Sequence, residues 1–160
     1  PFAMVLMKPE LDQWKPGEHN GTFRGNNLAF VTAKAAIDHY WSDDSFSNEI
    51  KRKGQYVSDR LDVIVEKYGE GNFTAKGRGM FLGINCVNGD IAGKITHHAF
   101  RKGLIIETSG ADDHVVKFLC PLIISDDNLK RGIDIVEEAI CEVCAREDIP
   151  EEELYFVANG

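Results

Sequence analysis

A polar, glycine-dense loop at residues 17–27 constrains the fold of this chain more than any other feature. Its eleven residues are mostly Gly, Asn, His, Thr and Arg, and they lie between two apolar segments. The backbone of such a loop can approach a ligand closely, and its amides and the Thr22 hydroxyl can point at an anion. From composition alone a long surface loop is the other interpretation, so the rest of the chain has to decide between the two.

The composition is that of a globular protein and argues against two classes of partner. With 160 residues, 43% hydrophobic and 28% charged, the chain can form one compact domain or part of a larger one. The net charge of −8 argues against nucleic acid, because phosphate binding needs a cationic face. No apolar run approaches the roughly 20 residues of a membrane span, and residues 1–7 do not read as a signal peptide. We therefore expect neither a nucleic-acid nor a membrane partner.

The cysteines predict a reduced protein without a metal centre. All four lie in apolar segments, which favours buried free thiols and a cytoplasmic location: Cys86, Cys120, Cys141 and Cys144. The last two form a C-x-x-C pair, but no second pair supplies the further ligands that zinc needs, so core packing is the expected role. His97 and His98 are adjacent on a predicted helix, where their side chains diverge by about 100° and cannot chelate one ion.

The apolar run at residues 2–7 predicts a strand buried on both faces, as in a parallel sheet. Such a strand needs neighbours, yet a short predicted helix at 8–14 and then the polar loop follow it. We therefore expect further sheet upstream of Pro1. The absence of an initiator Met suggests a truncated or processed product, or numbering that starts inside a longer protein.

Two helices are expected next. Asn26 or Asn27 can cap a helix over residues 28–41, because a side-chain oxygen there satisfies a first-turn amide. A longer helix is predicted over residues 45–68, ended by Gly69 and Gly71. Its apolar residues fall near helical spacing and form one stripe: Phe46, Ile50, Val57, Leu61, Ile64 and Tyr68.

The rest of the chain predicts a small α+β unit. Residues 73–87 alternate as a strand, and a helix from Asn88 is expected to stop at Gly103. Strands are predicted at 104–107 and 115–124. Ser125 is the expected N-cap of a last helix, which would bury Leu129, Ile133, Val136, Ile140 and Cys144.

Four segments in one order make the chain resemble the C-terminal part of the class III, pyridoxal-phosphate-dependent aminotransferases. Residues 1–6 look like the strand after the family's Schiff-base lysine turn, and residues 17–26 resemble its Gly-Glu-His, Thr-aromatic and Gly-Asn loop. Residues 77–83 look like the Arg-Gly-x-Gly-Leu-type strand, and residues 117–122 match the Arg-x-x-Pro-Pro-Leu segment. The resemblance is nearest to the diaminobutyrate–2-oxoglutarate group, which works in ectoine synthesis.

The resemblance implies an α/β fold of the fold-type-I transferases and an obligate homodimer that holds pyridoxal 5′-phosphate at its interface. It divides the chain into the tail of the large cofactor domain, a connecting helix, a C-terminal α+β domain and an acidic tail: residues 1–44, 45–70, 71–147 and 148–160. The orphaned apolar strand, the long helix and the small α+β unit agree with that division.

The resemblance also implies roles for five residues. Thr22, with Gly21 and Phe23, would bind the phosphate of the partner subunit's cofactor; capping the next turn is the alternative role for Thr22. Arg24 would clamp a substrate carboxylate or pair with a surface carboxylate. Lys117 stands where the family commonly has Arg, so the positive charge is kept but the bidentate geometry of a guanidinium is lost. Lys117 would bind a substrate carboxylate or be a solvated lysine on an edge strand.

Amino-group transfer needs a lysine that forms a Schiff base with the cofactor. In this family that lysine lies upstream of the residue matching Pro1, and no lysine here fits a buried nucleophile, so we expect no catalytic residue in these 160 residues and no activity from them alone. The implied reaction moves an amino group from glutamate to aspartate 4-semialdehyde. Two alternatives stay open: a class III enzyme for another ω-amine, and a non-catalytic α+β binding or dimerisation module.

Overall fold

A computed structural model of the chain describes residues 2–69 and 72–146. The chain divides into two compact units, Pro1–Ser47 and Asn48–Gly160. The predicted acidic tail at 148–160 and the predicted helix-ending Gly71 lie outside the described residues. Across the described ranges, no helix is both long enough and apolar enough to cross a membrane.

The first unit holds the short 3-10 helix η1 (Pro9–Leu11) and the helix α1 (Asn27–Tyr40). Asn26 caps α1 as expected, because its side-chain oxygen accepts from the amides of Leu28 and Ala29 at 3.0 and 3.2 Å. The strand predicted at residues 2–7 is wrong: this segment is exposed and forms no strand. A strand is stable only when neighbouring strands satisfy its backbone groups, and the described residues offer it none.

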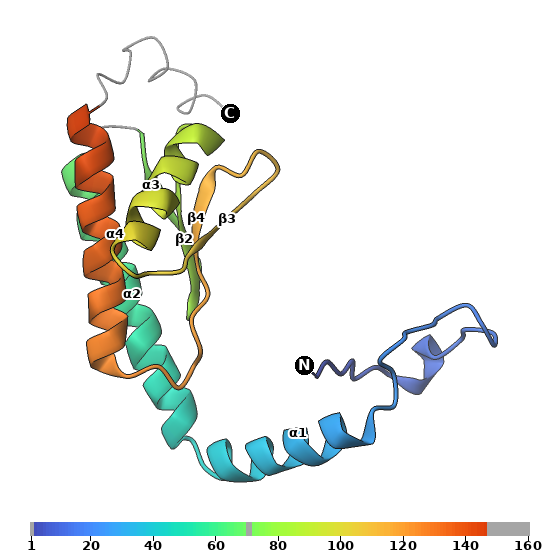
Figure 1. The fold of residues 1–160 in the computed structure, drawn as a ribbon. Coiled ribbons are helices and arrows are strands. Elements are labelled where there is room, and N and C mark those ends of the chain that lie inside the picture. The colour runs from blue at the N-terminus through green and yellow to red at the C-terminus, as the bar shows by residue number, and fades with distance from the viewer. Residues whose placement is uncertain (1, 70–71, 147–160) are drawn as a thin grey trace. The chain divides into compact units, whose positions relative to one another are not determined.

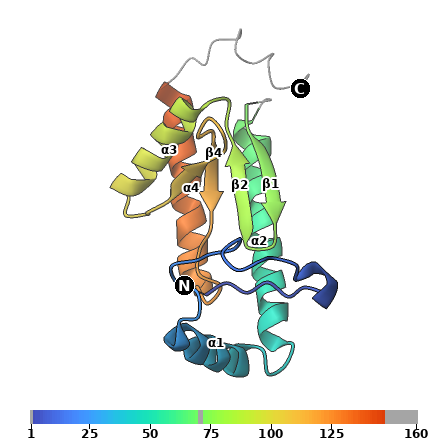
Figure 2. The ribbon, with the colours of Figure 1, turned by 90° about the vertical axis from the view of Figure 1, so that its right-hand side faces the viewer.

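The second unit is an antiparallel sheet with helices packed on it (Figure 1). Its strands are β1 (Thr74–Arg78), β2 (Phe81–Asn85), β3 (Glu107–Ser109) and β4 (Val115–Phe118), in the order β1-β2-β4-β3. Turning the molecule shows α2 and α4 behind β1, β2 and β4 (Figure 2). The sheet therefore has one face toward the helices and another face, carrying Lys76 and Phe81, that the described helices leave exposed.

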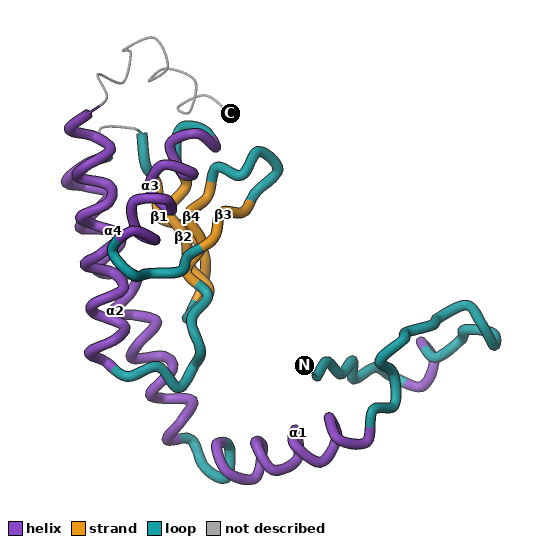
Figure 3. The backbone as a smooth tube through the Cα atoms, in the orientation of Figure 1, coloured by secondary structure: helices purple, strands orange, loops and turns teal. Residues whose placement is uncertain are grey.

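Three helices complete this unit: α2 (Ser45–Tyr68), α3 (Gly89–Arg101) and α4 (Asp126–Arg146), drawn together in Figure 3. The predicted bounds of α2 are confirmed, and so are the start of α3 at Asn88, which proves to be its N-cap, and the start of α4 after Ser125. Their apolar stripes meet the inner face of the sheet in one core that includes Leu61, Ile84 and Ile95. Apolar burial of this kind supplies most of the stabilisation of such a unit.

The single strand predicted over residues 73–87 is wrong, because the chain turns back at Gly79 and forms the β1–β2 hairpin. Gly77 and Gly79 have φ of 121° and 61°, which favour glycine and permit the turn. The turn also lies against α2, where a Cβ at Gly54 would come within 2.8 Å of the Gly79 carbonyl carbon. Glycines at both positions thus allow the hairpin and the helix to approach closely.

The two later strands are shorter or displaced relative to the prediction. β3 begins at Glu107, where 104–107 was expected to be the whole strand, and β4 ends at Phe118, well before residue 124. Pro121 has no amide to donate to a ladder, so the apolar residues 119–124 form an irregular connection to α4.

The prediction that every cysteine is buried is only partly right. All four are free, but Cys141 is exposed and Cys120 and Cys144 are half-buried, which leaves Cys86 as the buried thiol. In α4, Val143 takes the core position expected for Cys144. Among the described residues, no group of three or more His, Cys, Asp or Glu side chains could hold a metal ion.

Candidate functional site

The polar loop is held by local hydrogen bonds that leave its tip open to solvent. The Glu18 carboxylate accepts from the Lys15 amide at 2.7 Å, and the Arg24 amide donates to the Gly21 carbonyl at 3.1 Å. Gly17 and Gly25 have φ of 90° and 73°, so these two glycines are the ones whose conformation the loop requires. The loop therefore turns at Gly21–Arg24 and then enters α1 through the Asn26 cap.

Thr22 is exposed in this turn, and its hydroxyl forms no hydrogen bond within the described part of the chain. Asn26, not Thr22, caps the helix that follows. Phe23 beside it is 87% exposed. The loop thus presents a free hydroxyl and an apolar ring, together with backbone amides, on one turn.

Among the residues that the structure describes, the guanidinium of Arg24 contacts no carboxylate. Its Nη1 donates to the His19 carbonyl at 2.6 Å, while the His19 ring lies edge-on to Trp14, with ring centroids 5.1 Å apart. These groups line a hollow of about 700 Å³ inside the first unit, which Thr22 and Phe30 also line. The Arg24 side chain therefore stabilises the loop through its hydrogen bond to the His19 carbonyl.

Lys117 lies in the second unit, on β4, between β2 and β3. The edge-strand alternative for Lys117 is therefore wrong. Its cross-strand neighbours are Gly83 on one side and Glu107 on the other. The Lys117 ammonium lies 3.0 Å from Oε2 of Glu107, and the two side chains are 22% and 75% exposed. Lys117 thus stands on an interior strand with one exposed counter-ion.

A cavity of about 250 Å³ opens beside this ion pair, between β3, β4 and α4. Glu107 and Lys117 are the two charged residues among the described residues that line it, and the remaining lining is largely apolar. Cys120 also lines the cavity, and its burial raises the pKa of its thiol. The strand register places the Lys117 and Glu107 side chains on the sheet face that carries Lys76, opposite the face that packs on α4, so the wall of the cavity itself is largely apolar.

One lysine of the second unit is buried. Lys53 of α2 is buried, and its ammonium donates to the Ile124 carbonyl at 2.6 Å and lies 3.4 Å from Oε1 of Glu49. The sequence carried a signal for this, because position 53 falls between Ile50 and Val57 on the apolar stripe of α2. With both contacts made, Lys53 fixes the start of α4 and offers no free amine.

The family model of the class-III aminotransferases matches residues 1–140 of this chain. The chain belongs to this family. The expectation drawn from the four motif segments is thereby confirmed.

Two curated relatives share a name. A diaminobutyrate–2-oxoglutarate transaminase of Halomonas elongata is 57% identical over 139 residues, which cover 86% of this chain and 33% of that protein. The protein of the same name from Vibrio parahaemolyticus is 52% identical over 146 residues, 91% of this chain and 35% of that protein. The chain thus spans about a third of the length of the curated relatives it matches.

Solved aminotransferase structures share the fold. The N-acetylornithine aminotransferase of Stenotrophomonas maltophilia is 28% identical with a TM-score of 0.65, over 77% of this chain and 33% of that one. The acetylornithine aminotransferase of Elizabethkingia anophelis is 26% identical with a TM-score of 0.64, over 82% and 34%. The predicted fold class, part of an α/β aminotransferase, is confirmed.

Proposed function

We propose that this chain is the C-terminal portion of an aminotransferase that converts glutamate and L-aspartate 4-semialdehyde to 2-oxoglutarate and L-2,4-diaminobutyrate. The observation that carries the proposal is the 45–57% identity, over most of this chain, to eight relatives, seven of them named for diaminobutyrate and 2-oxoglutarate. Exchanging the 4-amine of diaminobutyrate for the oxo group of 2-oxoglutarate yields the semialdehyde and glutamate, so the reverse direction balances as written. We further propose that this enzyme takes part in ectoine synthesis and that it is located in the cytoplasm.

The cofactor in this proposal is pyridoxal 5′-phosphate, bound in a homodimer. Gly21, Thr22 and Phe23 would hold its phosphate, because a free hydroxyl and nearby amides on a glycine-rich turn suit a dianion. The fit is supported by the exposed Thr22 hydroxyl, which caps no turn among the described residues, while Asn26 caps the helix that follows. When bound, the cofactor is the electron sink that amino-group transfer requires.

Substrate carboxylates would be bound by Lys117 and by Arg24. Lys117 supports this role with its positive charge and with an exposed counter-ion that can move away. Arg24 would have to exchange its bond to the His19 carbonyl for a ligand. The amine that bonds the cofactor covalently would come from outside these 160 residues, since Lys53 is committed to Ile124 and Glu49.

The direct test assays the parent enzyme, by which we mean the complete aminotransferase that carries these residues. With 2-oxoglutarate as acceptor, we expect a higher kcat/KM for L-2,4-diaminobutyrate than for L-ornithine, N-acetylornithine or L-lysine. A preference for one of the other amines would replace this proposal with another class III reaction. No turnover of any amine would favour a non-catalytic module.

The cofactor role is tested separately with Thr22→Ala. Loss of a charge-assisted hydrogen bond should raise the dissociation constant for pyridoxal phosphate about tenfold in the parent enzyme. Thr32→Ala is the matched control, because the Thr32 hydroxyl is exposed in the same unit and bonds to its own helix, to the Leu28 carbonyl. Equal affinity in the Thr22 and Thr32 variants would remove Thr22 from the site.

A further inference from the structure

The proposed function leaves the C-x-x-C pair of α4 without a role. The sequence predicts core packing for both cysteines, yet Cys141 is exposed and only Cys144 packs partly against the core. Both thiols are free. Packing therefore explains the second cysteine and leaves an accessible thiol three residues before it.

Helical spacing places these two thiols next to each other. Residues three apart in an α-helix have Cα atoms about 5 Å apart, within the range of roughly 4.4–6.8 Å that a disulfide accepts. Their Cβ atoms are about 5–6 Å apart, and a disulfide needs about 3.5–4.5 Å, so the bond requires a movement of about 1 Å. Cys144 lies in the last turn of α4, which ends at Arg146. A last turn can move in this way because its carbonyls lack partners within the helix.

The surroundings give the two thiols different tasks. Burial raises the pKa of the Cys144 thiol, and the negative charge of a Cys141 thiolate raises it further, so the two sulfurs lie within electrostatic range of each other. Cys86 is also near Cys144, but it is 1% exposed and belongs to the core. A small reagent in solvent therefore meets Cys141 first, and Cys144 is positioned to react second.

We propose that Cys141 and Cys144 form a reversible disulfide by exchange with a small-molecule disulfide, with Cys141 as the attacking thiol and Cys144 as the resolving thiol. The Cys141 thiolate attacks one sulfur of the small disulfide, whose S–S bond breaks, and one small thiol leaves with the electron pair. Cys144 then gives its proton to solvent and attacks the Cys141 sulfur, which releases the second small thiol. Two cysteine thiols are oxidised, and one small disulfide is reduced to two thiols.

The bond changes the contact between α3 and α4. Its formation draws Cys144 away from the core and shifts Glu142, which lies between the two cysteines. The Glu142 carboxylate holds α3, since its oxygens lie 2.8 Å from Nδ1 of His98 and 2.9 Å from Nζ of Lys102. A disulfide that requires such a movement is easily reduced, which suits the cytoplasm, where disulfides are transient or redox-sensing.

The test follows the pair in the parent enzyme by mass spectrometry. The enzyme is equilibrated with mixtures of glutathione and glutathione disulfide, quenched in acid, alkylated and digested with trypsin. Both cysteines then lie in one peptide, residues 132–146, which follows Arg131 and ends at Arg146. As the share of glutathione disulfide rises, we expect this peptide to lose two hydrogens and both alkylation sites. Dithiothreitol should restore both sites.

Two variants separate the steps. Cys144→Ser should stop the exchange halfway, with glutathione attached to Cys141. Cys141→Ser should abolish both products, because the remaining thiol is half-buried. Cys120→Ser is the matched control, since Cys120 is another half-buried free thiol, on the connection between β4 and α4, and the peptide should oxidise in this variant as it does in the unmodified enzyme.

Full alkylation of Cys141 and Cys144 at every glutathione ratio would overturn the inference. So would a glutathione adduct on Cys141 that persists in the unmodified enzyme, because the second step would then not occur. A bond between Cys144 and Cys86 would also overturn it, since that bond requires the core to open. None of these outcomes depends on which amine the enzyme uses, so this inference and the proposed function fail separately.

Discussion

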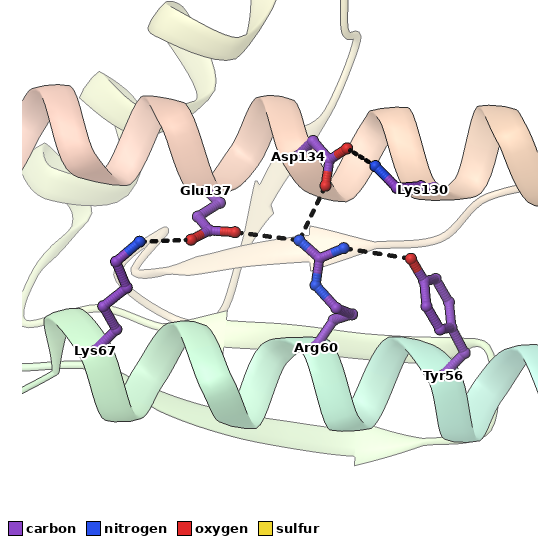
Figure 4. A network of polar contacts seen from close by, with 6 residues as sticks. All are labelled: Tyr56, Arg60, Lys67, Lys130, Asp134 and Glu137. Atoms are coloured by element: carbon purple, nitrogen blue, oxygen red, sulfur yellow. Dashed lines mark hydrogen bonds and ion pairs between the residues drawn. The ribbon is translucent and has the colours of Figure 1, made fainter.

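Arg60 of α2 donates from Nη2 to Oδ1 of Asp134 on α4 at 2.9 Å, and the same nitrogen lies 3.1 Å from Oε2 of Glu137. Figure 4 shows the guanidinium between the two helices, with Tyr56 on its other side. Lys130 and Lys67 complete the network at Asp134 and Glu137, at 2.6 and 2.9 Å. The polar sides of α2 and α4 are thus joined beside the core that their apolar stripes form.

Arg60→Met should destabilise the protein, because it removes a partly buried cation that two carboxylates share. We expect the free energy of unfolding to fall by about 1–2 kcal/mol, the range for hydrogen bonds to charged groups at a half-exposed site. Urea unfolding monitored by circular dichroism measures this. Lys34→Met is the control, since its pair with Asp38 is exposed within α1, and it should change stability by less than about 0.5 kcal/mol.

The same network predicts a loss of stability in acid. Hydrogen bonds from Lys130 and Arg60 lower the pKa of Asp134 from 3.8, and those from Lys67 and Arg60 lower that of Glu137 from 4.5. A carboxyl whose folded pKa is depressed stabilises the fold above its unfolded pKa and loses that contribution as the pH falls through the folded value. Stability should therefore decline below about pH 4.5. Asp134→Asn should flatten this decline in urea titrations at pH 3 to 6, and an unchanged slope would contradict the assignment.

Lys53→Met tests the buried ammonium. Methionine can fill the space of the lysine stem, but the Ile124 carbonyl and the Glu49 carboxylate then lose a partner. The free energy of unfolding should fall by about 1–3 kcal/mol, the cost of leaving such a group unsatisfied. Lys51→Met, at an exposed position of the same helix, should have almost no effect. Equal stabilities of the two variants would mean that water replaces the lost contacts.

Much of the fold follows from local sequence signals. The caps at Asn26, Asn88 and Ser125 fix helix starts through short-range hydrogen bonds, so those starts could be predicted. The helical spacing of the apolar residues in α2 likewise made its first and last residues predictable. By contrast, the turn at Gly79 was hidden inside an alternating run, because pattern alone does not show where a strand reverses.

The candidate site was less accessible to prediction. A resemblance to known motifs indicated Thr22 and Lys117, but neither spacing nor composition pairs Lys117 with Glu107, ten residues earlier in the chain. That pair depends on the register of β3 against β4, which the hairpin between them determines. The strand expected at residues 2–7 failed for a related reason: strand formation depends on neighbours that no local pattern supplies.

Gly77→Ala should destabilise the β1–β2 hairpin strongly. Gly77 has a φ of 121°, and a Cβ there would lie 2.3 Å from the Phe81 carbonyl oxygen. Backbone strain and this clash should together cost about 2 kcal/mol or more. Gly93→Ala is the matched control, because its added Cβ in α3 would meet nothing within 4 Å beyond its chain neighbours and the helix's own backbone, and it should stabilise the protein by about 0.5–1 kcal/mol. Both are measured by urea unfolding, and a loss in both variants would point to a general intolerance of the unit.

The four thiols should differ in reactivity according to their burial. Burial raises the pKa of Cys86 to about 12, and it also raises that of Cys144, whereas Cys141 is exposed on α4. Because the thiolate is the reactive form, iodoacetamide at pH 8 should label Cys141 first. Cys86 should react only after unfolding in guanidinium. Mass spectrometry of tryptic peptides over a time course measures the order, with the Cys141→Ser variant as control. Early labelling of Cys86 in native conditions would mean that the core around β2 opens more readily than its packing indicates.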